Sequence, residues 1–182
     1  MVTRVLTLLL AVLVVFSISS MAQDKAVAAS KFVGVKACSM CHKSDQKGNQ
    51  FGVWQKSKHA EAYKTLTGAK AADIAKAKGI KNAAEAPECL SCHGAVDPKL
   101  VDKYDAKDGV QCETCHGAGS AYKGMAIMKD KAKAIAAGLH EFKDKAAIEK
   151  FCTDCHNEKS PTFKEFKFDE AWGKIKHTVP KG

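Results

Sequence analysis

The longest apolar run of the chain lies near its start, where residues 5–16 follow Arg4 and precede the small-residue stretch of residues 17–22. Ser20 and Ala22 stand at the spacing that signal peptidase reads. Twelve helical residues rise only about 18 Å, which is short of the roughly 30 Å hydrocarbon core of a bilayer. We therefore predict a signal peptide over residues 1–22 and one exported domain over residues 23–182. An uncleaved membrane anchor is the alternative.

Further along the chain, apolar positions recur at helical spacing around His59. Together with Ala62, Tyr63 and Leu66, this histidine forms a stripe at positions i, i+3, i+4 and i+7. A histidine on such a stripe usually packs in a core as an ordinary side chain. The pattern predicts a helix that carries His59 toward the interior.

Two more helices are predicted in the second half of the chain. The first covers residues 122–137 and ends at Gly138, with its apolar stripe formed by Met125, Met128, Ala132, Ile135 and Leu139. The second begins at Asp169 as N-cap, with Glu170 in its first turn, and its stripe is Phe168, Ala171, Trp172 and Ile175. Pro180 disfavours helix before it, so we expect the chain to turn near Lys176.

The composition supports helices and long loops with little or no sheet. Alanine and lysine are abundant and alternating β-branched segments are scarce. Residues 23–182 carry 28 lysines against 20 acidic residues, a net charge of +8. These lysines are scattered and show no clustering with arginine or aromatic residues, which argues against nucleic acid as a partner.

All eight cysteines fall into four copies of one pattern, C-x-x-C-H, which is the attachment signature of c-type haem. Two thiols three residues apart form thioethers with the two vinyl groups of one porphyrin, and the adjacent imidazole ligates the iron. The predicted cofactor-binding residues are Cys38, Cys41, His42, Cys89, Cys92, His93, Cys112, Cys115, His116, Cys152, Cys155 and His156.

Four disulfides or zinc sites are the competing interpretations of eight cysteines, and neither explains the four histidines. We therefore predict four covalently bound haems in about 160 residues. Porphyrin must then supply much of the apolar interior, and eight propionates would offset the basic charge. The predicted fold class is a mainly α multihaem cytochrome c, with helices and long loops wrapped around the haems.

The histidine count limits the sixth ligands of the four irons. Only three histidines remain outside the motifs, namely His59, His140 and His177. At least one haem must therefore use methionine, another group or nothing. His59 and His177 are the stronger candidates, whereas His140 follows Gly138 in a predicted loop and is equally well an ordinary surface residue.

Methionine thioether is a known haem ligand that raises the reduction potential. Met128 and Met125 lie on the predicted helix after the third motif, where filling the core is their usual role. Met128 is the preferred candidate of the two. Met40 lies inside the first motif and is poorly placed to ligate.

The order and local sequence of these motifs resemble the cytochrome c-554 family of tetrahaem carriers, over nearly all of the chain after residue 22. The resemblance rests on residues 38–43, on Trp54 with residues 59–60, on residues 112–119 followed by Tyr122, and on residues 166–170 before His177. The third motif, with its glutamate and the Gly-x-Gly that follows, is the most specific piece. Glycine there would let the backbone pass close to a haem face.

The resemblance implies a ligand for each haem. His59 would ligate the fourth haem opposite His156, and His177 the third opposite His116. In the family a histidine soon after the third motif serves the first haem, and Met128 takes that place here. The family's second haem is five-coordinate, which would leave His93 alone, unless His140 closes that site or replaces Met128 at the first haem.

These observations predict an electron-transfer protein, not an enzyme, working in the periplasm between redox partner proteins. No nucleophile–base pair or nucleotide-binding loop is evident, and no membrane span remains after signal cleavage. The enzyme alternative is binding or reduction of nitric oxide, nitrite or hydroxylamine at an open haem. A monomer is favoured, and a haem filament that shares a histidine between subunits is a third possibility.

Overall fold

The computed structural model describes residues 30–94 and 96–179, so the predicted signal peptide lies outside the described residues. This part of the chain is mainly helical. Its β-structure is one isolated bridge between Phe32 and Val101. The prediction of helices and long loops with little or no sheet is confirmed.

Most helices are short, because glycine, proline and capping residues interrupt the chain every few turns. Three 3₁₀ helices, η1 (Asp45–Lys47), η2 (Pro98–Leu100) and η3 (Ala106–Asp108), join them. The described α-helices are α2 (Val35–His42), α3 (Gln50–Gln55), α4 (Ala62–Thr65), α5 (Ala69–Ala77), α6 (Pro87–His93), α7 (Cys112–His116), α8 (Met125–Met128), α9 (Lys131–Ala136), α10 (Lys145–Cys152) and α11 (Phe168–Ile175).

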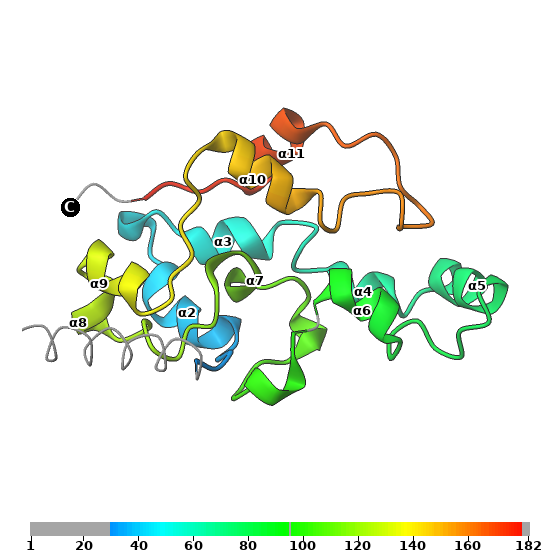
Figure 1. Ribbon diagram of the computed structural model, residues 1–182, viewed down its shortest axis with the longest axis horizontal. Coiled ribbons are helices and arrows are strands. Elements are labelled where there is room, and N and C mark those ends of the chain that lie inside the picture. The colour runs from blue at the N-terminus through cyan, green and yellow to red at the C-terminus, as the bar shows by residue number, and fades with distance from the viewer. Residues whose placement is uncertain (1–29, 95, 180–182) are drawn as a thin grey trace, which may run out of the picture.

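The helices form an elongated arrangement (Figure 1). Helix α2 packs against α3 and α7 near its centre, and α8 packs against α9. Helix α4 contacts both α6 and η3. Helix α5 lies at the end of the molecule opposite to α8 and α9 (Figure 1).

Buried polar side chains, more than apolar ones, tie the centre of the fold together. The Glu113 carboxylate, 2% exposed, accepts hydrogen bonds from the backbone N–H groups of Val33, Gly34 and Gly119 at 2.6–3.1 Å. The Gln111 side chain accepts from the backbone of Val35 at 2.7 Å. These bonds fix the segment before α2 against α7, since buried donors need partners.

The apolar core of the polypeptide is small. The described residues bury eleven hydrophobic side chains, and five of these are alanine. The cluster of buried hydrophobic residues comprises Leu66, Ala71, Ala75 and Ala83, against which Cys89 and Leu90 of the second motif pack. Alanine buries little area, so the chain alone gains little of the hydrophobic stabilisation expected for its length.

The structure differs from the predicted helix around His59. Helix α3 ends at Gln55, and turns separate it from α4, which begins at Ala62, so His59 lies between two helices. The His59 carbonyl accepts a hydrogen bond from the backbone of Val110 at 2.9 Å. That long-range bond occupies the carbonyl and anchors this segment beside the third motif.

The predicted helix over residues 122–137 is also divided. Asp130 caps the start of α9 by accepting from the Lys133 backbone at 3.1 Å, and this separates α9 from α8. The stripe is wrong as a core face, since Met125 is 60% exposed while Ala134 is buried. The predicted stop at Gly138 is confirmed by its φ of 102°.

The N-cap of the C-terminal helix, α11, lies two residues earlier than predicted, at Lys167 instead of Asp169. Asp169 and Glu170 stand in its first turn, where negative charge is favourable. The predicted turn near Lys176 is confirmed, because α11 ends at Ile175 and Lys176 has extended backbone angles. Phe168 is buried and stacks against Trp172.

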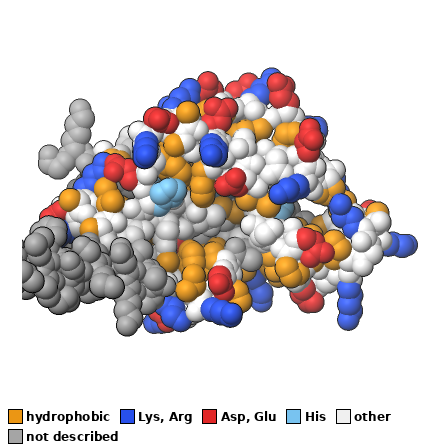
Figure 2. All heavy atoms as spheres, in the orientation of Figure 1, with side chains coloured by type: hydrophobic (Ala, Val, Ile, Leu, Met, Phe, Trp, Pro, Cys, Tyr) orange, Lys and Arg blue, Asp and Glu red, His pale blue; other side chains and the backbone are white. Residues whose placement is uncertain are grey.

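None of the helices in residues 30–94 and 96–179 has the length and apolar character needed to cross a membrane. Charged side chains of both signs cover much of the face shown in Figure 2, with hydrophobic atoms exposed between them.

Candidate haem-binding site

Three of the four C-x-x-C-H motifs lie on short helices that end at the motif histidine. These helices are α2, α6 and α7. In the fourth motif the helix α10 ends at Cys152, and turns carry Cys155 and His156. One helical turn places both thiols of each pair on one side, as attachment to one porphyrin requires.

Contacts between cysteines establish which motifs are neighbours. The Cys112 thiol raises the pKa of Cys38, and α2 packs against α7, which links the first motif to the third. Cys115 interacts electrostatically with Cys152, which links the third motif to the fourth. Burial and the neighbouring Cys92 thiol raise the pKa of Cys155 to about 12, which links the fourth motif to the second.

The motifs therefore contact one another in the order first, third, fourth, second. This order differs from their order in the sequence. It leaves the first and second motifs at the two ends of the series.

Two pairs of imidazole rings face each other at similar distances. The ring centres of His59 and His156 lie 6.1 Å apart, and those of His116 and His177 lie 5.9 Å apart. Phe166 stacks on His156 with ring centres 4.6 Å apart and an angle of 13° between the planes, which orients that imidazole.

The spacing in both pairs fits a metal ion between the rings. An imidazole nitrogen binds a metal at about 2.0–2.1 Å, and the ring centre lies roughly 1.1 Å beyond that nitrogen. Two such ligands on opposite sides of one metal therefore place their ring centres about 6.2 Å apart. The observed separations of 6.1 and 5.9 Å suit one iron in each pair.

Two of these imidazoles are also kept in the neutral form that binds metals. Burial, followed by the nearby imidazoles of His177, His42 and His140, lowers the pKa of His116 to about 4. Burial, followed by the proximity of His156, lowers the pKa of His59. A neutral imidazole keeps a nitrogen lone pair for the metal.

Hydrogen bonds orient three further histidines through their Nδ1 atoms. His42 Nδ1 lies 3.2 Å from Gln50 Oε1. His93 Nδ1 donates to the Ala62 carbonyl at 2.7 Å, and His140 Nδ1 donates to the Cys115 carbonyl at 3.2 Å. Such bonds fix the tautomer and leave Nε2 free to ligate.

The remaining candidates lie near the third motif or on α8. The His140 backbone donates to the His116 carbonyl at 2.9 Å, and its ring packs against Phe142 with centres 4.4 Å apart. Met125 begins α8 and is 60% exposed, whereas Met128 ends α8 and is half-buried. The structure thus brings His140 into contact with the third motif.

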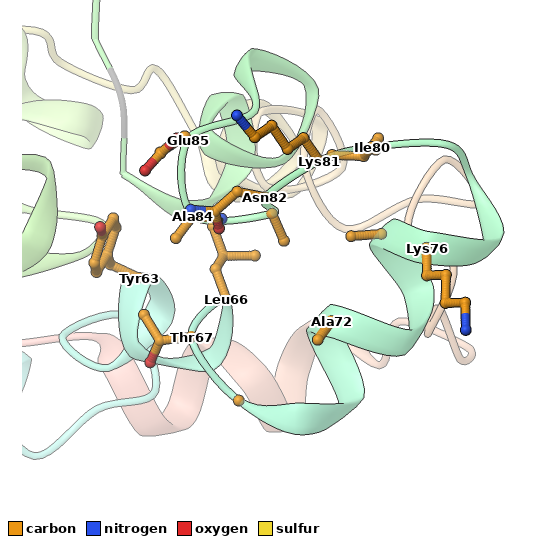
Figure 3. A pocket seen from close by; sticks show the side chains of 13 residues that line it. Tyr63, Leu66, Thr67, Ala72, Lys76, Ile80, Lys81, Asn82, Ala84 and Glu85 are labelled. Carbon is orange, nitrogen blue, oxygen red and sulfur yellow. The ribbon is translucent and has the colours of Figure 1, made fainter.

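His93 and His42 each lack the ring partner that His116 and His156 have among the described residues. Of the six other imidazoles, all within the described residues, none forms a close ring pair with His93. Near its motif, α4, α5 and the following loop enclose an open hollow of about 570 Å³ (Figure 3). Its lining includes Tyr63, Leu66 and Ile80.

The residues present fit covalently bound haem. All eight cysteines are free of disulfides, and the small polypeptide core leaves apolar space that porphyrin can fill. Within the described residues, no group of three or more His, Cys, Asp or Glu side chains is arranged to hold a metal ion by itself. That arrangement does not match the zinc interpretation.

The sequence did not identify the residues that support these histidines. Gln50, the Ala62 carbonyl and the Cys115 carbonyl each reach an Nδ1 atom from a distant or adjacent segment. The role of Glu113 as a buried acceptor for three backbone donors was likewise missed. A hydrogen bond to a backbone carbonyl leaves no pattern in a sequence. The glutamate inside the third motif, by contrast, could have been recognised from the sequence as a residue with a structural role.

Comparison with known proteins supports the same cofactor. A family model described as "Cytochrome c554 and c-prime" matches residues 37–117, which include the first three motifs. Cytochrome c-554 of Nitrosomonas europaea is 28% identical over 146 residues, covering 69% of this chain and 57% of that protein. No solved structure matches. Residues 37–117 are therefore similar to the cytochrome c554 and c-prime family.

Proposed function

We propose that the protein is an electron carrier with four covalently bound c-type haems that passes electrons between redox partner proteins outside the cytoplasm. Its family relationship implies c-type haem and electron transfer. The aligned part of the chain spans 57% of that relative's length, so the number of haems, the location and the partners belong to the proposal.

The observation that carries the proposal is the contact order of the motifs. Cysteines of the first and third, third and fourth, and fourth and second motifs lie within electrostatic reach of one another. Haems attached there would form one continuous series through a small protein. A series with two separate ends suits a protein that accepts an electron at one end and donates it at the other.

In the proposed ligand set, each motif histidine binds its own haem iron on one side. His59 completes the fourth haem opposite His156, and His177 completes the third opposite His116, in keeping with ring separations of 6.1 and 5.9 Å. The first haem, on His42, takes either Met128 or His140. The ligand type would set its potential, since thioether raises it relative to imidazole.

The chain's own residues position the cofactors and tune their environment. The Nδ1 bonds of His42, His93 and His140 hold the imidazoles in one tautomer and strengthen them as ligands. Haem, when bound, supplies the exchange of one electron at iron. Ligand identity, burial and hydrogen bonding then spread the potentials of the four irons.

The test is a redox titration of the purified protein followed by optical and EPR spectra, combined with its intact mass. Four haems attached to the chain that starts after residue 22, with at least two low-spin bis-histidine signals, are expected. Fewer than four attached haems, or no reversible reduction, would contradict the proposal. The mass also tests cleavage after Ala22, and gel filtration tests the expected monomer against a filament.

A second candidate function is small-molecule chemistry at the second haem. It is favoured by the absence of any imidazole paired with His93 among the seven described histidines. An open iron there would bind nitric oxide and show a high-spin signal that disappears on binding. Four low-spin haems that leave nitric oxide unbound would contradict this candidate and leave electron transfer alone.

A further inference from the structure

A lysine-rich projection lies beside the second motif, which is one end of the motif series. We call residues 62–84, which comprise α4, α5 and the loop that follows, the lysine arm. Helix α5 forms the end of the molecule in Figure 1, and α4 joins it to α6 of the second motif. The arm therefore extends away from the other three motifs.

The arm carries an excess of positive charge. Its five lysines, Lys64, Lys70, Lys76, Lys78 and Lys81, are all exposed, and Asp73 is its single acidic residue. The four ion pairs found among the described residues all involve residues 130–170, outside the arm. The lysines in those ion pairs are Lys131, Lys133, Lys145 and Lys167.

The positive charge of the arm reaches the cofactor attachment point. The pKa of the Cys89 thiol is raised by burial and by Glu88, and Lys78 opposes that rise. The Lys78 ammonium therefore lies within electrostatic reach of the cysteine that would hold the second haem. A partner docked on the arm would meet the edge of the molecule closest to that haem.

The arm also encloses the hollow shown in Figure 3, which is lined by both apolar and polar side chains. Leu66, Ala75 and Ile80 contribute apolar atoms, while Lys76 and Lys81 line it from α5 and the following loop. Glu85, just beyond the arm, is the acidic side chain in the lining. Apolar side chains beside charged ones are a combination that protein–protein interfaces also use.

We infer that the lysine arm is the docking surface for an acidic electron-transfer protein that exchanges electrons with the second haem. This inference rests on the proposed function. Complementary charge would steer the partner, with its acidic rim against the lysines and an apolar side chain in the hollow. One electron passes at each encounter, so one iron in the partner is oxidised and one haem iron is reduced, or the reverse.

A protein suits this surface better than nucleic acid or a membrane. The arm has no arginine and a single aromatic residue, Tyr63, so it lacks the means to stack bases. None of the large hydrophobic side chains exposed in the described residues lies in the arm, so it offers nothing to insert into a bilayer.

The test measures electron transfer from an acidic protein of known structure, reduced plant-type [2Fe–2S] ferredoxin, to the oxidised holoprotein by stopped flow. The double variant Lys76→Glu/Lys81→Glu reverses two charges on the hollow. Lys123→Glu/Lys143→Glu makes the same charge change at exposed lysines outside the arm. Reduced lumiflavin, a small donor without net charge, reports whether the haems of each variant still accept electrons.

At low ionic strength the arm variant should react with ferredoxin about tenfold more slowly than the wild type, because steering is lost. The control variant should change less than about twofold, and added salt should slow the wild type and remove the difference. If both variants react with ferredoxin equally slowly, the rate depends on the net charge of the protein and not on the lysine arm, which would overturn the inference.

Two other results separate this inference from the proposed function. If the wild type accepts electrons from lumiflavin but reacts with ferredoxin without salt dependence, the docking inference fails and the carrier function stands. If neither donor reduces the protein reversibly, the proposed function itself fails. Tight binding of the wild type, but not of the arm variant, to vesicles of anionic lipid with no effect on ferredoxin would assign the arm to a membrane instead.

Discussion

A single side chain, the imidazole of His59, is expected to set the spin state of the iron that His156 binds. Its ring centre lies 6.1 Å from that of His156, and burial keeps it neutral. Replacing His59 by alanine should convert one low-spin haem to high spin without removing the thioether bonds that hold it. EPR spectra of the oxidised variant measure this change.

The control variant for this prediction is Lys58→Ala, which alters the adjacent exposed side chain and should leave all signals in place. Added imidazole should restore the lost low-spin signal in His59→Ala by occupying the vacated position. An unchanged spectrum of His59→Ala would show that another group ligates the fourth haem.

Glu113 carries a second prediction at the residue scale, this time about stability. Its buried carboxylate accepts from the backbones of Val33, Gly34 and Gly119. Glu113→Ala leaves these donors without partners, and the holoprotein should lose about 3 kcal/mol of unfolding free energy. Chemical denaturation followed by haem absorbance measures this loss.

Glu149→Ala, at an exposed glutamate on α10, is the matched control and should cost less than about 0.5 kcal/mol. Glu113→Gln keeps one acceptor oxygen but places an amide N–H donor beside the three backbone donors. Its loss of unfolding free energy should therefore lie between those of Glu149→Ala and Glu113→Ala. If Glu113→Ala loses as little unfolding free energy as the control, other contacts hold the segment before α2.

At the scale of the elements, the start of α9 depends on one exposed carboxylate. The backbone N–H of Lys133, followed by its side chain, lowers the pKa of Asp130 below its ordinary value of 3.8. Because the pKa of Asp130 is lower in the folded than in the unfolded chain, its charged form stabilises the fold at pH values above the unfolded-state pKa. This stabilisation is lost as the pH falls through the lowered pKa of the folded state.

Asp130→Asn tests this pH dependence, because asparagine also caps helices but does not titrate. The wild type should melt at a slightly higher temperature than the variant near neutral pH, and the difference should vanish in acid. Calorimetric scans over a pH series measure the melting temperatures of the wild type and of the variant. A difference that stays constant with pH would mean that the charge of Asp130 has no part in holding α9.

The same elements show how far the sequence could predict the fold. Helical composition, the Gly138 stop and the turn near Lys176 were predicted correctly, because each depends on neighbouring residues. Helix breaks at His59 and Asp130 were missed, since the first is caused by a hydrogen bond from distant Val110. The second followed from a capping bond that apolar spacing does not reveal.

The candidate site divides in the same way. The four motifs were readable because covalent attachment fixes their spacing, whereas the separations between His59 and His156 and between His116 and His177 depend on tertiary packing. The resemblance to a family supplied those pairings, and composition alone did not. The contact order of the motifs arose only from the folded chain, because no local pattern encodes it.

For the whole molecule, the small apolar core implies that haem is part of the structural interior. The described residues bury eleven hydrophobic side chains, five of them alanine, and much of the remaining contact is between short helices and loops. Short helices are marginal in water without tertiary packing. Removing the porphyrins would therefore remove the surface against which these helices pack.

We accordingly expect residues 23–182, produced without haem attachment, to lack a cooperative thermal transition and to lose much of their helical circular dichroism. The holoprotein, by contrast, should unfold cooperatively, because the thioether bonds keep the porphyrins within the chain throughout. The control replaces both cysteines of the second motif, which lies at one end of the motif series, by serine. That variant should retain cooperative unfolding in the part that holds the other three motifs, while the lysine arm loses its support. Cooperative melting of the haem-free chain near the temperature of the holoprotein would mean that the polypeptide forms its own core.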